Sequence, residues 1–421
     1  MTSEIAVMNQ RAVALAADSA VTLVDGSTVV VRNDQRKLFQ LVDGRTIGAM
    51  YFGVADIMGH PWDRLIEHYQ GKIQPRAFAQ VGEYGESFVA MLDNLPEFFP
   101  QERQKDDYKR LLASVFRYIF HLAQNSRENN GAGPAEANDT QLLEEAIERV
   151  WRDYQFQENG KPRSDLGCFP SGFGGRILRE YSQTIDELIA YGFQPFSLGR
   201  ASVQRLRDIA VFAVIKDLFL EDVTGIVFAG FGTHDHYPVA VTYYVSAIVC
   251  GIVKRAPASH DAIDGSTRSK IRVFADSEVT NAFIRGIDYN LEGRVYGGVR
   301  MMLSGLVDQV VGAFPGASAR SRESVRQHAQ AQLIPQYFEH FRGMTGEFQQ
   351  QKFINPVLRV LEIASRSELA ETARELITLN AFKKRIMAQK QTVGGAIDVA
   401  VISRESGFQW YTRQDRGKVH G

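Results

Sequence analysis

Two short apolar runs, at residues 5–8 and 12–17, stand at the start of this 421-residue chain and are separated only by Asn9-Gln10-Arg11. Three polar residues between two apolar runs are typical of a β-hairpin. Further β-type runs follow at 28–31, 37–42 and 46–52, with Asp43-Gly44 as a turn before the last of them. The N-terminal part therefore predicts a set of antiparallel strands with tight connections.

The rest of the chain alternates between helical segments and strands. Apolar residues at helical spacing predict helices, and β-branched runs predict strands. The expected helices cover residues 56–69, 77–93, 106–124, 139–154, 176–191, 201–220, 291–314, 324–341, 345–363 and 366–389. The expected later strands cover residues 224–231, 237–253, 270–275, 396–403 and 408–411.

This order of strands, helices, strands, helices and a closing strand is that of an α+β layered protein. Two blocks of strands can form two stacked antiparallel sheets with a helix layer on each outer face, which is a four-layer αββα sandwich. We expect a single domain over residues 1–421, with two helical regions inserted at about residues 95–220 and 318–364.

Composition limits the classes of function. The formal net charge is -1, so charge gives no reason to expect binding to nucleic acid or to an anionic membrane. Cys168 and Cys250 lie far apart and predict a reduced, cytoplasmic chain. No secretory signal follows Met1, and the apolar segment 237–253 suits a long strand better than a membrane span. We therefore expect a cytoplasmic protein without membrane or nucleic-acid partners.

The first forty residues also supply the parts of an N-terminal nucleophile. Removal of Met1, expected before a small residue, leaves Thr2 with a free α-amine that can act as the base for its own hydroxyl. A charged Lys37 beside them would lower the pKa of both groups. Asp18, at the end of the second apolar run, would pair with that lysine and hold it in place.

Two further features could form sites. A turn near Met50 to Gly53 could supply backbone N–H donors to an oxyanion. His234-Asp235-His236 has atoms that can bind a metal but no assigned third ligand, so we interpret it as a solvated turn. No metal or other cofactor is expected.

Taken together, these residues resemble the proteasome β-subunit family of N-terminal nucleophile (Ntn) hydrolases, here as a bacterial proteasome-like protein with large helical insertions. Thr2 and Ala16-Ala17-Asp18-Ser19 stand at the separation found in that family, and Lys37 follows after a slightly longer loop. Residues 47–56 resemble the strand and helix start that shape the oxyanion hole. The resemblance extends to a central hairpin at 226–245 and to the last helix and closing strand at 367–399.

The resemblance implies a threonine-type hydrolase that cleaves amide bonds, above all peptide bonds, through an acyl-enzyme on Thr2. Asp18 would orient the site, Lys37 would activate the nucleophile, and Met50, Phe52 and Gly53 would form the oxyanion hole and pocket. Phe52 departs from the pattern, since the family usually has a glycine there and the phenyl ring would crowd the pocket. The supporting Ser and Asp of the family are not evident before Gly394.

The resemblance also implies partners. A polypeptide or other amide would be the substrate, copies of the chain would assemble into a homo-oligomer such as a ring, and a separate ATPase or regulator could act with it. Two alternatives stay open: a catalytically inactive member kept for assembly or binding, and an amidase for small amides on the same fold.

Overall fold

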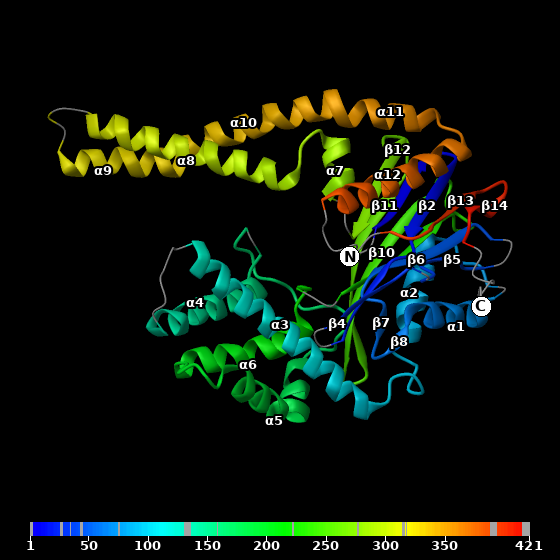
Figure 1. Cartoon of the computed structure of the whole chain (residues 1–421), viewed down its shortest axis with the longest axis horizontal. Helices are drawn as coiled ribbons and strands as arrows, with labels where there is room; N and C mark the ends of the chain where they lie inside the picture. The colour runs from blue at the N-terminus through cyan, green and yellow to red at the C-terminus, as the bar shows by residue number, and fades with distance from the viewer. Residues whose placement is uncertain are drawn as a thin grey trace. The chain divides into compact units, whose positions relative to one another are not determined.

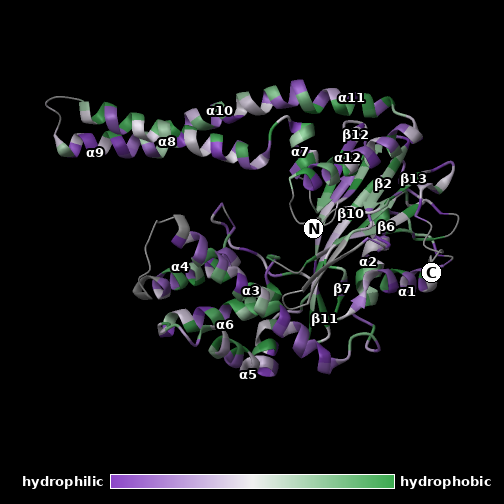
Figure 2. Cartoon of the chain, viewed as in Figure 1, coloured by the Kyte–Doolittle hydropathy of each residue, from purple (hydrophilic) through white to green (hydrophobic). Residues whose placement is uncertain are grey.

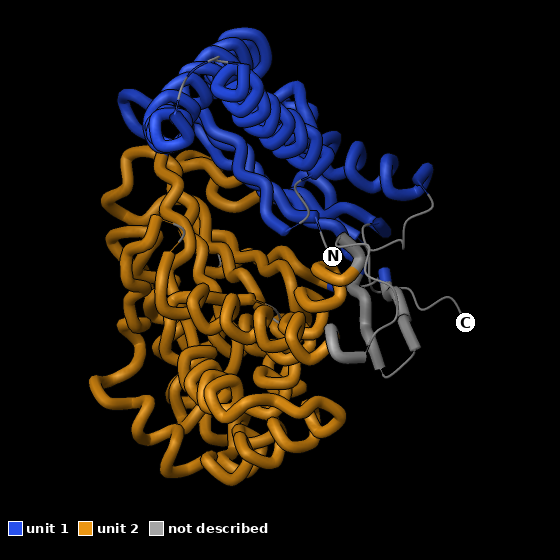
Figure 3. Tube along the Cα trace, turned by 90° about the vertical axis from the view of Figure 1, so that its left-hand side faces the viewer, with its two compact units in different colours: residues 1–35, 263–401, 410–421 blue, residues 36–262, 402–409 orange. Residues whose placement is uncertain are grey.

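The computed structural model describes residues 3–25, 28–33, 35–42, 45–74, 76–129, 136–157, 159–220, 223–275, 278–313, 316, 318–387 and 394–414. The chain is a mixed α/β protein with several antiparallel sheets, and it divides into two compact units (Figure 3). Unit 1 comprises residues 1–35, 263–401 and 410–421, and unit 2 comprises residues 36–262 and 402–409.

Unit 1 is built on a five-stranded sheet with helices on one face (Figure 1). The strand order is β12 (Ser269–Ala275), β1 (Ser3–Asn9), β2 (Ala12–Asp18), β13 (Ile397–Ser403) and β14 (Gly407–Thr412). β1 pairs antiparallel with both β12 and β2, which confirms the N-terminal hairpin. Alternate residues of these strands, such as Ile5 and Ala14, pack against α12 (Arg366–Ile386) and α11 (Asn355–Ile363).

Asn9 fixes the turn of the β1–β2 hairpin and ties it to the helix layer. Its Oδ1 accepts hydrogen bonds from the backbone N–H groups of Arg11 and Ala12. Its Nδ2 donates to the C=O groups of Leu361 and Ala364, at 2.9 Å each. Those carbonyls lie at the C-terminal end of α11, where the last C=O groups lack i+4 partners within the helix. The polar residue that breaks the two apolar runs therefore also completes the end of a helix.

The helical part of unit 1 forms a long hairpin, called the arm here. Its helices are α7 (Glu278–Arg285), α8 (Tyr289–Ala313), α9 (Ala319–His328), α10 (Ile334–Gln349) and α11. Two single turns of π-helix, Ala329–Leu333 and Gln350–Ile354, join α9, α10 and α11, so the expected break between residues 341 and 345 is wrong. Each π turn is followed at once by a residue and then a proline, Pro335 or Pro356. Proline has no N–H to donate along the helix, and the widened turn accommodates that loss.

Unit 2 is built on a second five-stranded sheet, in which every neighbouring pair is antiparallel. The strand order is β11 (Ile252–Ala262), β10 (Val239–Val249), β9 (Thr224–Gly230), β6 (Ile47–Gly53) and β5 (Leu38–Gln40). Helices α1 (Trp62–Ile73) and α2 (Val81–Leu92) pack on one face, against side chains such as Tyr51 and Phe228. Leu38, Met50 and Val227 alternate with these residues and are also fully buried.

Four helices of unit 2 form a bundle with a core of its own (Figure 1). Its helices are α3 (Gln101–Asn129), α4 (Glu136–Gln155), α5 (Phe173–Phe193) and α6 (Arg200–Ile215). Leu112, Ile147, Ile177 and Ile209 are completely or almost completely buried in this core, and Cys250 at the β10–β11 turn extends it to the sheet. The helical spacing of apolar residues predicts all four helices because each has one such buried face.

The expected single strand over residues 237–253 is wrong, because the segment contains a hairpin turn. Cys250 and Gly251 have φ values of 49° and 80° and join β10 to β11. Two residues with positive φ form the type of tight turn that suits the twist of a hairpin. No helix in the described part of the chain has both the length and the apolar character needed to cross a bilayer.

Three local expectations also need correction. The first helix begins at Trp62, not at residue 56, because β7 (Asp56–Ile57) and β8 (His60–Pro61) form a small hairpin before it. A strand, β3 (Val21–Asp25), pairs with β4 (Thr28–Arg32), and the sequence interpretation had missed it. Helix α7 had also been missed. Its length of eight residues is too short for a clear helical period.

A buried lysine joins β11 to the end of α6. The Nζ of Lys254 donates to the C=O groups of Ala213 at 2.8 Å and Leu218 at 2.7 Å. Nζ also lies 4.3 Å from the centre of the Phe219 ring. Burial lowers the pKa of Lys254 to about 7. A neutral amine has two N–H bonds, and the two carbonyls accept both of them.

This lysine gives unfolding a pH dependence. In the unfolded chain its pKa is about 10.4, so between pH 7 and pH 10 the unfolded state binds more protons than the folded state. The free energy of unfolding should therefore rise with pH over that range, by up to about 1.4 kcal/mol per pH unit. We expect a Lys254→Met variant to lose this rise in urea denaturation series. Lys352→Met, at an exposed lysine, should keep it, and identical slopes for wild type and Lys254→Met would contradict the assignment.

Candidate functional site

Unit 1 holds a buried carboxylate at the end of its second strand. Asp18 is only 1% exposed, and its two oxygens accept the backbone N–H groups of Ser3 at 3.2 Å and Gly394 at 3.0 Å. Ser3 begins β1 and directly follows Thr2, which lies outside the described residues. The structure thus fixes a carboxylate at the N-terminal end of the first strand.

Helix α12 adds two polar side chains to this end of unit 1. The Nδ2 of Asn380 donates to the Oγ of Ser3 at 3.1 Å. Lys384, one turn further on the same helix face, is 4% exposed. Burial lowers the pKa of Lys384, and the charge of Asp18 opposes that shift. Within unit 1, the amine of Lys384 is therefore close enough to Asp18 for the two groups to interact.

The sequence interpretation had missed Asn380 and Lys384, although a signal was present. The apolar stripe of the last helix runs through Leu369, Ala373 and Leu376, and the next two positions on that stripe are Asn380 and Lys384. Polar residues at positions that a helix buries have to find partners. Such residues are candidates for a site as well as for structural bonds.

Unit 2 places the other expected site residues on two adjacent strands. Lys37, 1% exposed, directly precedes β5, and its C=O accepts the N–H of Tyr51 on β6 at 3.2 Å. Met50, Phe52 and Gly53 lie on β6. Unit 2 thus brings Lys37 together with the expected pocket strand, whereas Asp18 belongs to unit 1.

Gly53 is required by the backbone where β6 ends. Its φ is +92°, a conformation that side chains disfavour. A Cβ atom there would lie 2.2 Å from the carbonyl oxygen of Val223, which also accepts the N–H of Val54 at 3.3 Å. The close approach of the two strands therefore explains this glycine without any catalytic role.

Phe52 packs along its own sheet. Its ring lies over Gly225 of β9, where a Cβ atom would come within 2.0 Å of the ring. The ring also meets Tyr244 edge-on at 6.4 Å between centroids, and Tyr244 contacts Phe219 at 5.8 Å. The Phe52 ring thus occupies space that only a glycine at position 225 leaves free. The sequence interpretation had missed this contact.

A cavity of about 570 Å³ adjoins the Asp18 end of unit 1, a volume in the range of small-molecule sites. Gly394, whose N–H binds Asp18, forms part of its wall. Leu379 and Phe382 of α12 supply apolar surface, and Glu375 and Arg385 supply charges of both signs.

The His234-Asp235-His236 turn has a structural role. One carboxylate oxygen of Asp235 accepts the N–H groups of Val81 and Gly232 at 2.9 Å each, so it completes the first turn of α2. Across the described ranges, no group of three His, Cys, Asp or Glu side chains is arranged to hold a metal ion.

Comparison with models of known protein families finds no match for this sequence. Comparison with curated protein sequences finds no match either.

The contact between Phe52 and Gly225 predicts a stability effect. Gly225→Ala should lower the free energy of unfolding by about 1–3 kcal/mol, because the added methyl group overlaps the ring. The matched control is Gly82→Ala, where a Cβ atom meets nothing within 4 Å. In urea denaturation, Phe52→Ala combined with Gly225→Ala should cost less than the sum of the two single changes. Strict additivity would contradict the contact.

Replacement of the buried carboxylate predicts a change at Lys384. Asp18→Asn removes the negative charge that raises the pKa of Lys384, so that pKa should fall further below the usual range for lysine. NMR of ¹³C-methylated lysines would report the titration. The control is Asp398→Asn, a buried carboxylate of β13 that should leave Lys384 unchanged. An unaltered Lys384 in Asp18→Asn would show that the two groups do not interact.

Proposed function

We propose that this chain is a threonine-type Ntn hydrolase that cleaves amide bonds through an acyl-enzyme on Thr2. The observation that carries the proposal is the buried Asp18 carboxylate, held by two backbone N–H groups beside the residue that follows Thr2. Burial of a carboxylate is costly unless hydrogen bonds and a cation compensate it. Its position at the start of the chain suits a role in orienting a nucleophile there.

The proposed reaction follows from the groups at the N-terminus. Removal of Met1 frees the α-amine of Thr2, whose pKa near 7.7–8.0 makes it a usable base at neutral pH. The Oγ of Thr2 attacks the amide carbonyl carbon while its proton passes to the amine. Collapse of the tetrahedral intermediate expels the protonated leaving amine and leaves an ester on Thr2. Water then hydrolyses that ester and restores the hydroxyl.

The proposal assigns supporting roles to residues of both units. Lys37 would activate Thr2 by its charge, and Asp18 would stabilise and orient the cations of the site. Met50, Phe52 and Gly53 would form the oxyanion strand, with backbone N–H groups as donors. Lys384 adds a second amine near Asp18 that the sequence resemblance does not include.

We infer a four-layer αββα arrangement as the frame of this site. In each unit, helices cover one face of the sheet, and alternate strand residues pack against them. The strand residues between these are apolar and buried as well, and they form a second set. Leu38 and Met50 belong to this second set in unit 2, and Met8 and Leu15 belong to it in unit 1. Sheets with two apolar faces of this kind are typical of the inner layers of an αββα sandwich.

The substrate would be a polypeptide or another amide. Assembly of copies into a ring, with a separate ATPase or regulator, belongs to the same proposal and rests on the sequence resemblance.

The test uses the nucleophile itself. Thr2→Ala should reduce hydrolysis of peptide and small-amide substrates by at least about 10³-fold and abolish labelling by a β-lactone or epoxyketone probe, because the attacking oxygen is gone. Thr372→Ala, at a surface threonine of α12, should keep both activities. Intact mass should show that the wild-type chain lacks Met1.

The alternatives give different results in the same experiment. A chain that retains Met1 and takes up no probe would be an inactive assembly or binding protein. Labelling with hydrolysis of small amides only would identify an amidase. Full hydrolysis by Thr2→Ala would exclude the threonine mechanism.

A further inference from the structure

The two sides of the arm meet along a defined seam. On α8 the seam residues include Glu292, Tyr296 and Val311, and Glu292 and Val311 are buried. Tyr296 contacts the rings of Phe338 and Phe341 on α10. Because Asp308, further along α8, pairs with Arg326 on α9, the two sides run antiparallel.

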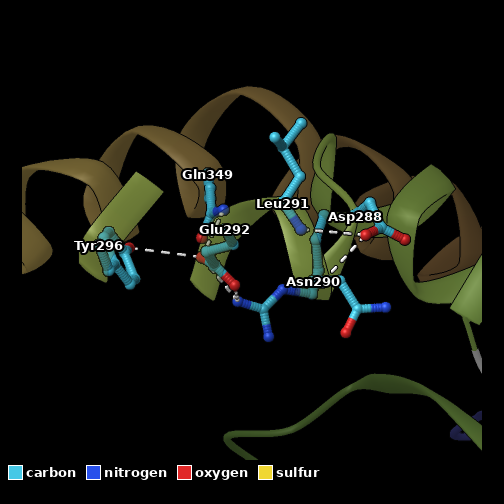
Figure 4. A network of polar contacts seen from close by, with 7 residues as sticks. Asp288, Asn290, Leu291, Glu292, Tyr296 and Gln349 are labelled. Atoms are coloured by element: carbon cyan, nitrogen blue, oxygen red, sulfur yellow. Dashed lines mark hydrogen bonds and ion pairs between the residues drawn. The ribbon is translucent and has the colours of Figure 1, made fainter. Parts of the chain in front are cut away.

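A buried polar network fixes the register of this seam (Figure 4). Both carboxylate oxygens of Glu292 lie within 3.1 Å of Nη2 of Arg285. One of these oxygens also accepts from Nε2 of Gln349 at 3.0 Å and from the Tyr296 hydroxyl at 3.3 Å. Gln349 is the donor of this network that lies on α10, so its hydrogen bond to Glu292 would break if α8 slid along α10. The arm is therefore a preformed element with defined faces.

A second apolar stripe runs along α8, one residue before each seam position. Its large side chains are 42% to 67% exposed. They are Leu291, Val295, Met302, Leu306 and Val310. Gly298 occupies the remaining position of the stripe, and a Cβ atom there would meet nothing within 4 Å.

The returning side of the arm repeats this pattern. Its seam residues include Ile334, Phe338 and Gln349, and the positions one residue earlier are again apolar and exposed. They are Leu333, Tyr337, Met344 and Phe348, with exposed fractions of 41% to 63%. His340 fills the remaining position. These four side chains and the five on α8 form what we call the apolar face.

Helix geometry places both stripes on the same side of the arm. A step of one residue turns by about 100° around a helix axis. Two antiparallel helices are related by a twofold axis perpendicular to the plane that contains them. A step of one residue back from the seam therefore brings the side chains of both helices to the same side of that plane. The stripe positions contain no Lys, Arg, Asp or Glu. The arm thus carries an uncharged, apolar surface drawn from two helices.

The opposite side of the arm has a different character. The positions one residue after the seam are glycine or polar on α8, among them Gly293, Arg300 and Asp308. On α10 they include Glu339 and Arg342. Figure 2 shows both hydrophobic and hydrophilic residues along the arm helices. Such a one-sided helical pair resembles half of a four-helix bundle.

We propose that the apolar face is a dimer interface, on which the arm of a second copy of this chain packs to complete a four-helix bundle. An isologous interface joins the same surface of two copies, and an apolar face without charged positions can pack against itself. The absence of charge from the stripe positions means that two copies bring no like charges together at its centre.

The size of the face suits a stable dimer. If each of its nine large side chains presents on the order of 100 Å², about half the area of an aromatic side chain, the face offers roughly 900 Å². Each partner in a standard-size protein interface contributes about 800 Å². The preformed seam keeps the cost of ordering the face low, because little has to move on association.

Sedimentation equilibrium of the full chain over a wide concentration range tests this interface. Met302→Glu on α8 and Met344→Glu on α10 should each raise the dissociation constant of self-association at least tenfold, because each places a carboxylate in an apolar contact. The matched control is Met301→Glu. Met301 is 73% exposed and directly precedes Met302, so a step of about 100° around α8 turns it away from the apolar face. This control should change the dissociation constant less than twofold.

The possible outcomes separate clearly. If the chain also forms a ring through other surfaces, Met302→Glu and Met344→Glu should halve the number of copies in the assembly, and Met301→Glu should not. A wild-type chain that stays monomeric, which would leave the face to lipid or to another protein, overturns the proposal. So does an assembly that neither face variant weakens. Circular dichroism and thermal unfolding should show that all three variants fold, and hydrolysis plays no part in the readout.

Discussion

The packing of the N-terminal hairpin against the last helices of unit 1 is the constraint on which the structure depends most. Every residue of β1 and β2 is buried, and alternate residues face α11 and α12, which come from the far end of the chain. Asn9 holds this packing through four hydrogen bonds. The same packing brings Gly394 and Lys384 to the end of the hairpin where Asp18 lies, so the candidate site depends on it.

The bundle of unit 2 and the arm of unit 1 bury their apolar residues in different ways. The bundle α3–α6 encloses a core of its own, so each helix hides its apolar stripe within unit 2. The arm has only two helical layers and cannot hide both of its stripes. When each helix of a pair has two apolar stripes, the pair can bury only one stripe of each helix, so one stripe on each helix stays exposed. The proposed dimer follows from that difference.

Local patterns predicted much of the fold. The helical spacing of apolar residues predicted most of the helices. The last of them begins after Ser365, which forms a capping box with Glu368. The sequence pattern did not predict the Cys250-Gly251 turn, because the residues on both sides of it are apolar and read as one strand. The π turns were not predicted either, because they accommodate the prolines and do not alter the spacing of apolar residues.

The sequence by itself determined the hairpin, most helices, and the candidate residues Thr2, Asp18 and Lys37, since these depend on residues close together in the chain or on motif spacing. Only the tertiary structure decided the hydrogen-bond partners of Asp18, the contact of Phe52 with Gly225, and which apolar face of the arm stays exposed to solvent. Those contacts join residues tens to hundreds of positions apart. Long-range contacts are set by the packing of whole elements, and no local period or propensity encodes them.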